Sequence, residues 1–187
     1  MLNSGADKIS INSAAVDNSK LIYESSRLFG SSTISVNIEY VQFDGKSFIT
    51  KSNGRDIVKV NPVSWAKKVE SLGAGEINIT SVNYEGLQRG FDIKNIKKIS
   101  KNINIPVLAH GGCGDPKDVL ELVKKTNVSG VVISSLLHYN SISKFIKIKP
   151  KIGNTNFLEN FKQNQTNINI ISKIKDTLSK EGFNVRN

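Results

Sequence analysis

The sequence lacks several features that mark particular classes of protein. Its 187 residues include one cysteine, Cys113, which by itself can form neither an internal disulfide nor a structural zinc site. No apolar run approaches the roughly 20 residues needed to cross a bilayer, which excludes a membrane-spanning protein. The first eight residues have no basic segment followed by an apolar core, so no secretory signal is expected and the expected location is the reducing cytoplasm. The length suits one domain better than two.

Acidic residues are few in comparison with basic ones. The chain has 16 Asp and Glu residues against 26 Lys and Arg residues, which gives a formal net charge of +10 at pH 7. Such a charge invites a nucleic-acid-binding interpretation. The lysines are scattered over the expected solvent faces of helices, however, so we expect no nucleic-acid partner. A positive field suits a phosphorylated metabolite equally well.

Short apolar runs alternate with segments of helical periodicity. Strands are expected at residues 8–12, 34–39, 76–80, 106–109 and 128–134. Helices are expected at residues 18–29, 62–72, 92–101, 116–126 and 170–180, the first with Leu21, Ile22, Leu28 and Phe29 on its inner side. The pair Asp44-Gly45 predicts a β-hairpin within residues 42–57. Residues 150–169 are rich in Asn, Gln and Lys, and are interpreted as a polar low-complexity insertion.

Strand–helix alternation with short loops predicts a parallel sheet with right-handed crossovers. Two architectures contain such a sheet, the open doubly wound fold and the (β/α)8 barrel. No Gly-x-Gly-x-x-Gly loop follows the first strand, which weakens the dinucleotide-binding form of the doubly wound fold. The five expected strands fall short of the eight in a closed barrel.

A glycine-rich turn follows the fourth expected strand and precedes a helix. The backbone N–H groups of Gly111 and Gly112 can approach an anion closely there, and the dipole of the helix favours negative charge. Ser134 and Ser135 end the last strand, and they can donate to the same anion. The alternative is that the glycines only allow a tight turn. A second, weaker candidate for an anion site, at the end of the first strand, consists of Asn12 and Ser13.

Charged side chains lie at both ends of the expected strands. Glu39 ends an apolar strand, so its carboxylate is expected to project into the mouth of the sheet and to transfer protons once burial raises its pKa. The alternative is a solvated carboxylate at the rim. Glu85, in the loop at residues 83–86, is expected to be exposed. Lys8 and Glu76 each begin a strand at the opposite end, where buried charges must pair, and an ordinary salt bridge is the alternative.

No metal site and no cofactor are expected. His110 and His138 have no third ligand at a suitable spacing, and His138 is expected to be a packing residue. Cys113 has no base beside it in the sequence and is expected to be inert. The chain contains neither a P-loop nor a nucleophile elbow.

Several segments of the sequence, in this order, resemble the cyclase subunit of imidazole glycerol phosphate synthase, a family of histidine biosynthesis. The segments are residues 5–16, 65–70, 72–77, 80–81, 90–92, 105–114 and 182–186. The resemblance extends from Gly5 to about Tyr139 and includes the C-terminal tail. It implies a (β/α)8 TIM barrel, of which residues 1–187 form one partial domain with about five C-terminal βα units, strands four to eight.

The resemblance also implies an activity and a partner. Members of the family are lyases that take ammonia from a glutaminase subunit docked under the barrel. They join this ammonia to a bisphosphorylated aminoimidazole carboxamide ribonucleotide. The products are imidazole glycerol phosphate and aminoimidazole carboxamide ribotide. No cofactor is implied.

Individual residues take roles from the same resemblance. The phosphate ligands are Asn12 and Ser13 for one phosphate, and Gly111, Gly112, Ser134 and Ser135 for the other. The substrate loop includes Ser81, Glu85 and Gly86. The gate at the ammonia entrance includes Lys8 and Glu76. The second catalytic carboxylate, an aspartate in the family, is replaced here by Glu39.

The sequence departs from the family at the catalytic positions. The other catalytic aspartate of the family lies on a first strand that this sequence does not contain. Glu39 is one methylene longer than aspartate, and the family's loop Asp-Arg-Asp-Gly-Thr is Asn-Tyr-Glu-Gly-Leu at residues 83–87. The chain alone is therefore expected to turn over poorly. Two alternatives stay open: an ammonia-delivering subunit of a surface-sugar amidotransferase, and a non-catalytic half-barrel that pairs with a separate N-terminal half or with itself.

Overall fold

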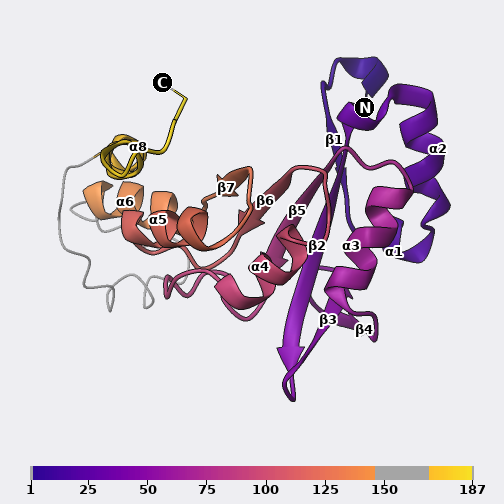
Figure 1. Ribbon diagram of the computed structural model, residues 1–187, viewed down its shortest axis with the longest axis horizontal. Coiled ribbons are helices and arrows are strands. Elements are labelled where there is room, and N and C mark those ends of the chain that lie inside the picture. The colour runs from indigo at the N-terminus through magenta and orange to yellow at the C-terminus, as the bar shows by residue number, and fades with distance from the viewer. Residues whose placement is uncertain (1, 146–168, 187) are drawn as a thin grey trace.

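The computed structural model describes residues 2–145 and 169–186, which form an α/β fold around one sheet (Figure 1). The polar insertion expected at residues 150–169 lies outside the described residues, with the exception of Asn169. The side chain of Asn169 accepts hydrogen bonds from the N–H groups of Ile171 and Ser172, and so caps the last helix. In the part of the chain that is described, no helix is long and apolar enough to cross a membrane.

Five strands of the described sheet run parallel, as the alternation predicts. They are β1 (Ile9–Ile11), β2 (Ile34–Phe43), β5 (Glu76–Ser81), β6 (Val107–His110) and β7 (Gly130–Val132), paired in this order. A doubly wound sheet reverses its strand order at a switch point, whereas this order never reverses. Sequential pairing is the arrangement of a (β/α)8 barrel, so the structure favours the second of the two architectures. β7 is shorter than the strand expected at residues 128–134.

The two faces of the sheet differ in chemistry. On β2 and β5 the apolar face consists of Ile34, Val36, Ile38, Tyr40, Ile77 and Ile79, each at most 1% exposed. The polar face consists of Ser35, Asn37, Glu39, Glu76, Asn78 and Thr80. Strands covered by helices on both faces have continuous apolar runs. The alternation indicates that helices cover only one face, and that the other face is the polar interior of a barrel.

Seven helices of at least one full turn flank this sheet within the described residues. They are α1 (Ser13–Asp17), α2 (Lys20–Phe29), α3 (Pro62–Ser71), α4 (Ile93–Ser100), α5 (Pro116–Lys125), α6 (Ser135–Phe145) and α8 (Ile170–Lys180). Prolines at the first turn of α3 and α5, each after a capping side chain, explain why these two begin where they do. Sequence periodicity does not predict α1 or α6.

The expected inner side of α2 is partly wrong. Ile22 is fully buried, but Leu28 is 74% exposed and Phe29 is 38% exposed. Leu28 follows Ile22 by six residues, which places it about 120° away around the helix. Phe29 points in nearly the same direction as Ile22 but is the last residue of the helix. Apolar character alone therefore misplaced these two side chains.

The hairpin forms as the sequence predicts. β2 turns through Asp44 and Gly45 into β3 (Lys46–Lys51), and both turn residues have the positive φ that a tight hairpin turn requires. A short strand β4 (Asp56–Val58) then pairs with β3. β3 pairs with residues 39–43 of β2, and β1 pairs with residues 34–36. Since β5 occupies the opposite edge, β1 and β3 share one edge of β2.

The C-terminal segment completes a second apolar core. α8 lies beside α5 and α6 in Figure 1, and the ion pair between Lys124 and Glu181 joins α5 to the end of α8. Phe183 and Val185 of the tail pack against this core. The tail segment that resembles the family therefore has a structural role.

Candidate functional site

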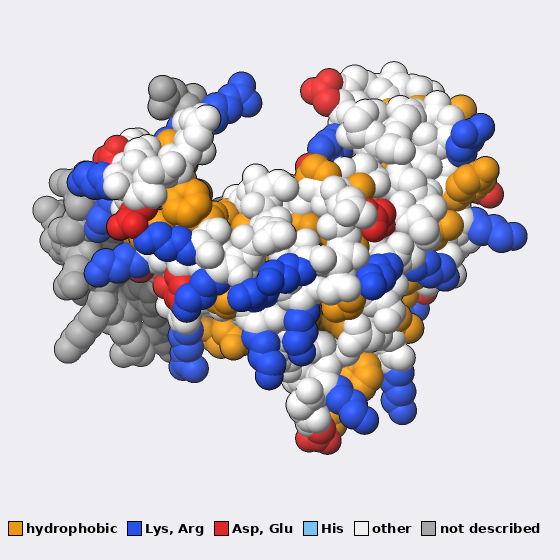
Figure 2. All heavy atoms as spheres, in the orientation of Figure 1, with side chains coloured by type: hydrophobic (Ala, Val, Ile, Leu, Met, Phe, Trp, Pro, Cys, Tyr) orange, Lys and Arg blue, Asp and Glu red, His pale blue; other side chains and the backbone are white. Residues whose placement is uncertain are grey.

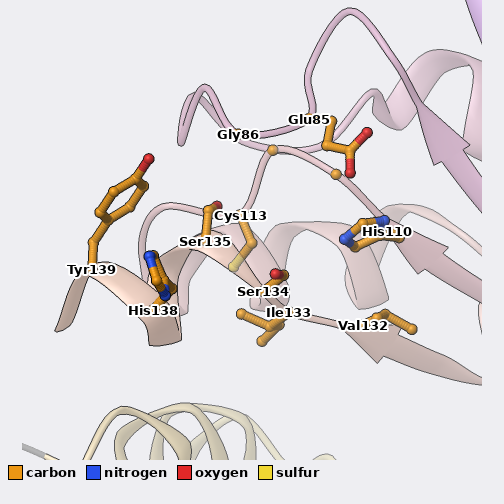
Figure 3. Close-up of a pocket in the computed structure, with 12 residues that line it drawn as sticks. Glu85, Gly86, His110, Cys113, Val132, Ile133, Ser134, Ser135, His138 and Tyr139 are labelled. Atoms are coloured by element: carbon orange, nitrogen blue, oxygen red, sulfur yellow. The ribbon is translucent and has the colours of Figure 1, made fainter. Parts of the chain in front are cut away.

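A pocket of about 250 Å³ opens at the carboxyl ends of β6 and β7 (Figure 3). Its walls include the glycine turn after β6 and the start of α6 after β7. The loop after β5 forms the third wall. Residues of the pocket that the sequence singled out are Glu85, Gly86, Gly111, Gly112, Ser134 and Ser135. The structure thus gathers residues from three separate segments, while their role in phosphate binding stays a prediction.

Close packing explains why the turn contains glycine. A Cβ on Gly112 would lie 2.0 Å from the carbonyl oxygen of Gly90, and the φ of Gly112 is +104°. Gly111 has a φ of +96°, and a Cβ there would lie 3.1 Å from the carbonyl oxygen of Ser81. The tight-turn interpretation of the two glycines is therefore sufficient by itself, so anion binding has to be argued from the groups that face the pocket.

Several of those groups are hydrogen-bond donors, and the one carboxylate in the lining belongs to Glu85, which is exposed. Among the described residues, the backbone N–H groups of Gly112 and Cys113 have no acceptor. α6 begins at Ser135, and the N–H groups in the first turn of a helix have no intrahelical acceptor. The positive end of the helix dipole lies at the same place. The two serine hydroxyls add further donors, so the pocket is suited to an anion.

Two histidines line the pocket, and the sequence assigned neither of them to it. His110 ends β6, and its Nδ1 lies 3.2 Å from the Oγ1 of Thr80. His138 was expected to be a packing residue, which is wrong because it is exposed on α6, next to the ring of Tyr139. The unexpected formation of α6 is the reason, since it turns residues after the last strand toward the pocket.

Glu39 lies on the polar face of the sheet, in one row with Thr80 and His110 on the next two strands. Adjacent strands are about 4.8 Å apart, so roughly 10 Å of sheet separates the Glu39 and His110 positions. The Oε2 atom of Glu39 is buried and has no hydrogen-bond partner among the described residues. Glu39 does not end its strand as expected, because β2 continues to Phe43 in the hairpin with β3. Its side chain nevertheless lies on the polar face, and a catalytic role stays a prediction.

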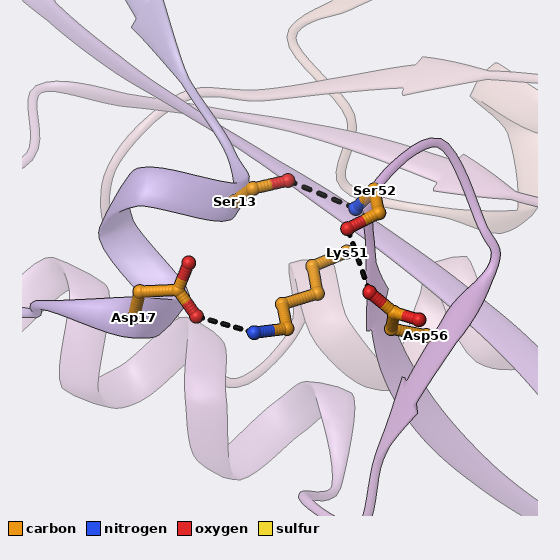
Figure 4. A network of polar contacts seen from close by, with 5 residues as sticks. All are labelled: Ser13, Asp17, Lys51, Ser52 and Asp56. Carbon is orange, nitrogen blue, oxygen red and sulfur yellow. Dashed lines mark hydrogen bonds and ion pairs between the residues drawn. The ribbon is translucent and has the colours of Figure 1, made fainter.

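The second candidate anion site is partly occupied by the chain itself (Figure 4). The Oγ of Ser13 accepts a hydrogen bond of 2.9 Å from the N–H of Ser52, in the loop between β3 and β4. The ion pair between Lys51 and Asp17 fixes the same loop against α1. The Oδ1 of Asn12 is buried and has no partner in the described part of the chain. Ser13 can still donate its own proton to an anion.

Lys8 and Glu76 form an ion pair of 2.9 Å at the amino ends of β1 and β5. The pairing agrees with the expectation for charges at this end of the sheet. The Lys8 side chain is 44% exposed, so the pair contributes at most about 1 kcal/mol to stability. The pair lies at the opposite end of the strands from the pocket, where the gate is expected, and a gating role stays a prediction.

Ser81 is fully buried and does not line the pocket. Its carbonyl oxygen accepts hydrogen bonds from the N–H groups of Tyr84 and Glu85, and so shapes the loop. Glu85 is exposed, as expected. The assignment of Ser81 to the substrate loop stays a prediction.

The surroundings of Cys113 agree with the expectation that it is unreactive. Burial, and then the nearby Asp118 and Asp115 carboxylates, raise the pKa of its thiol to about 12. A thiol that stays protonated is a poor nucleophile and a poor metal ligand. Within the described residues, no group of three or more His, Cys, Asp or Glu side chains could hold a metal ion.

A buried network that the sequence did not reveal centres on Asp92. The hydroxyl of Tyr40, near the end of β2, donates a hydrogen bond of 2.9 Å to the Oδ2 of Asp92. The other oxygen of Asp92 accepts from the backbone N–H of Asn95 and caps α4. Burial, and then the nearby Asp92 carboxylate, raise the pKa of Tyr40 above its ordinary value. The network fixes β2 to α4.

Comparison with known proteins identifies the family. The model for histidine biosynthesis proteins matches residues 1–143, a range that contains the whole pocket. The imidazole glycerol phosphate synthase subunit HisF of Hydrogenobaculum sp. (strain Y04AAS1) is 46% identical over 144 residues, which are 76% of this chain and 57% of that protein. The same subunit of Bacillus cereus (strain Q1) is 40% identical over 157 residues, 83% of this chain and 62% of that protein.

The subunit HisF of Clostridium botulinum (strain 657 / Type Ba4) is 36% identical across 100% of this chain and 64% of its own length. The chain thus spans between 57% and 64% of the length of these relatives. The sequential parallel sheet and the pocket at its carboxyl edge agree with the barrel fold of such proteins. The chain belongs to the histidine biosynthesis protein family.

Proposed function

We propose that this chain provides the cyclase site of an imidazole glycerol phosphate synthase. The reaction joins ammonia to a bisphosphorylated aminoimidazole carboxamide ribonucleotide, and gives imidazole glycerol phosphate and aminoimidazole carboxamide ribotide. The observation that carries the proposal is the pocket in which the glycine turn and the first turn of α6 face one space. One phosphate of the substrate accepts hydrogen bonds there from backbone N–H groups and from Ser134 and Ser135.

The other phosphate binds at Asn12 and Ser13, at the end of β1. β1 and β6 are three strand spacings apart, which is roughly 14 Å along the sheet. Such a span suits an elongated substrate with a phosphate at each end. The polar face between the two phosphate sites then lies under the reacting part of the substrate.

Glu39 lies between the two phosphate sites and acts as the acid–base group. Ammonia loses protons as it forms its new bonds to carbon, and the departing group takes up a proton. A carboxylate oxygen without a protein partner can accept the first proton and return it. The loop with Glu85 and Gly86 closes the third side of the pocket over the substrate.

Ammonia enters at the opposite end of the strands, and a glutaminase subunit docks there. Three rows of polar side chains on β2 and β5 lie between this entrance and Glu39. The first row contains Glu76, the second contains Asn37 and Asn78, and the third contains Thr80 beside Glu39. The Oδ1 of Asn78 is buried without a partner in the described part of the chain, so it can accept a hydrogen bond from ammonia in transit. The Lys8–Glu76 pair controls the entrance.

Titration with imidazole glycerol phosphate tests the phosphate site. The Ser134→Ala/Ser135→Ala double variant should bind it at least about tenfold more weakly in calorimetry, because it loses two hydrogen bonds to a charged group. The control double variant Ser64→Ala/Ser172→Ala changes exposed serines outside the pocket and should bind normally. No binding by the unmodified chain, or an equal loss in both variants, would overturn the proposed site. Ammonia-dependent turnover by this chain alone should be weak.

A second candidate function is ammonia delivery to a surface-sugar amidotransferase. It is favoured by Glu39 in place of aspartate, and by the sequence at residues 83–87, which lacks the threonine hydroxyl and one carboxylate of the family's loop. In this case the chain should bind a glutaminase but not imidazole glycerol phosphate. The titration above separates the two candidates.

The open sheet favours a partner that supplies strands. Within the described residues, one edge of β1 and one edge of β7 have no neighbouring strand. Unpaired edges form hydrogen bonds with other chains. We therefore propose that a further βα segment, or a second copy of this chain, pairs with these edges.

A further inference from the structure

A second cavity, of about 470 Å³, lies between the β2–β3 hairpin, the first turn of α3 and α4. It shares no lining residue with the pocket at the ends of β6 and β7. Four lysines line it: Lys46 from the hairpin, Lys59 from the segment before α3, and Lys94 and Lys98 from α4. No Asp or Glu is among its lining residues. Figure 2 shows Lys and Arg side chains gathered over α3, α4 and the hairpin.

The four lysines are not neutralised by the protein. In the described part of the chain, ion pairs involve Lys8, Lys51, Lys124 and Lys125, and none of the cavity lysines has an ion pair or a side-chain hydrogen bond. Four positive charges around one space repel one another. An anion that carries several charges relieves this repulsion, and its electrostatic energy of binding is more favourable than that of an anion with a single charge.

Two amide side chains in the lining of the cavity are held in place. Gln42 and Asn95 line it, and their amide nitrogens donate hydrogen bonds of 3.1 Å and 2.8 Å to the Oδ2 of Asp92. Asp92 itself is 2% exposed, lies behind this wall, and also accepts from Tyr40. Its carboxylate orients the two amides and does not itself line the cavity.

We propose that this cavity binds an oligophosphate chain, either free or as part of a nucleoside triphosphate. Four lysines match the three to four negative charges of such a chain, and lysine is a point-charge ligand for phosphate. The volume lies within the range of about 300–1,000 Å³ that is usual for small-molecule sites. Phe48 also lines the cavity and offers an aromatic face on which a base can stack.

Calorimetric titration of the full chain with inorganic tripolyphosphate and with ATP, in about 0.15 M salt, tests the site. The variant Lys94→Gln/Lys98→Gln should bind both at least about tenfold more weakly. The control Lys97→Gln/Lys101→Gln removes the same charge from α4 and its C-cap, at positions that are exposed, as Lys94 and Lys98 are, but do not line the cavity. It should change the affinity less than about twofold.

The possible outcomes separate the sources of the phosphate chain. Tighter binding of ATP than of tripolyphosphate, lost in Phe48→Leu, assigns the site to a nucleotide. Equal affinity for the two assigns it to the phosphate chain alone. An equal loss in both lysine variants would show only a general attraction to a basic protein, and would overturn the proposal. Binding of a long RNA with no binding of either small probe would also overturn it.

Discussion

Gly112 tolerates no side chain unless the backbone around it moves. Its φ of +104° is strained for other residues, and a Cβ would meet the carbonyl oxygen of Gly90 at 2.0 Å. We expect Gly112→Ala to lower the free energy of unfolding by about 3 kcal/mol. The same change should weaken phosphate binding. Gly86→Ala, where nothing lies within 4 Å, should cost about 1 kcal/mol. Urea unfolding measures both, and similar losses would contradict the close approach.

Ionisation of the Cys113 thiol makes the free energy of unfolding depend on pH in the alkaline range. Its pKa is about 12 in the folded chain, against an ordinary value of 9.0, so above pH 9 the unfolded chain loses a proton that the folded chain keeps. The contribution of the thiol to the free energy of unfolding is complete below pH 9. It falls as the pH rises toward 12, by at most about 1.4 kcal/mol per pH unit. In urea unfolding between about pH 9 and 10, the free energy of unfolding of Cys113→Ala should therefore fall less steeply with pH than that of the unmodified chain. Equal slopes in both proteins would contradict it.

Single residues were predictable where they follow a strand directly. The glycine pair and Ser134-Ser135 were identified because strand ends meet at one edge of a parallel sheet. Glu39 was identified by the same reasoning, although β2 continues past it to Phe43. His110 beside Thr80, and Tyr40 on Asp92, depend on the register between strands and on where a helix begins. Neither is encoded in local spacing, so the sequence did not reveal these contacts.

At the scale of elements, the contact of Tyr40 with Asp92 joins β2 to α4. Tyr40→Phe leaves a buried carboxylate oxygen with one donor fewer, and should lower the free energy of unfolding by about 1–3 kcal/mol. Tyr23→Phe is the matched control, because Tyr23 is 53% exposed on α2 and should change stability by less than about 0.5 kcal/mol. Thermal unfolding compares them. A neutral Tyr40→Phe would mean that water replaces the lost donor.

Elements with strong terminal signals were predicted almost to the residue. α5 begins at a proline after a capping aspartate, and α8 is strongly amphipathic. The sequence did not predict α6, because its 11 residues contain three serines and an asparagine, and its apolar residues have little helical periodicity. α1 has only five residues and is held by tertiary contacts rather than by its own propensity.

At the scale of the whole molecule, the open sheet edges should make the purified chain associate. Sedimentation velocity over a hundredfold range of concentration should show a sedimentation coefficient that rises with concentration. Added salt should strengthen this association, because the chain carries a net charge of +10 that opposes it. A monomer at every concentration would mean that side chains protect the edges of β1 and β7.

The shared edge of β2 has a consequence for the order of folding. The hairpin of β2 and β3 joins neighbouring residues, and hairpins form within about 1–10 μs. The parallel pairs join residues separated by whole helices, and such distant contacts form later. When β1 arrives, β3 already occupies residues 39–43 of the edge, which leaves residues 34–38, and β1 pairs with three of these. Early formation of the hairpin thus limits the length that the later pairing between β1 and β2 can reach.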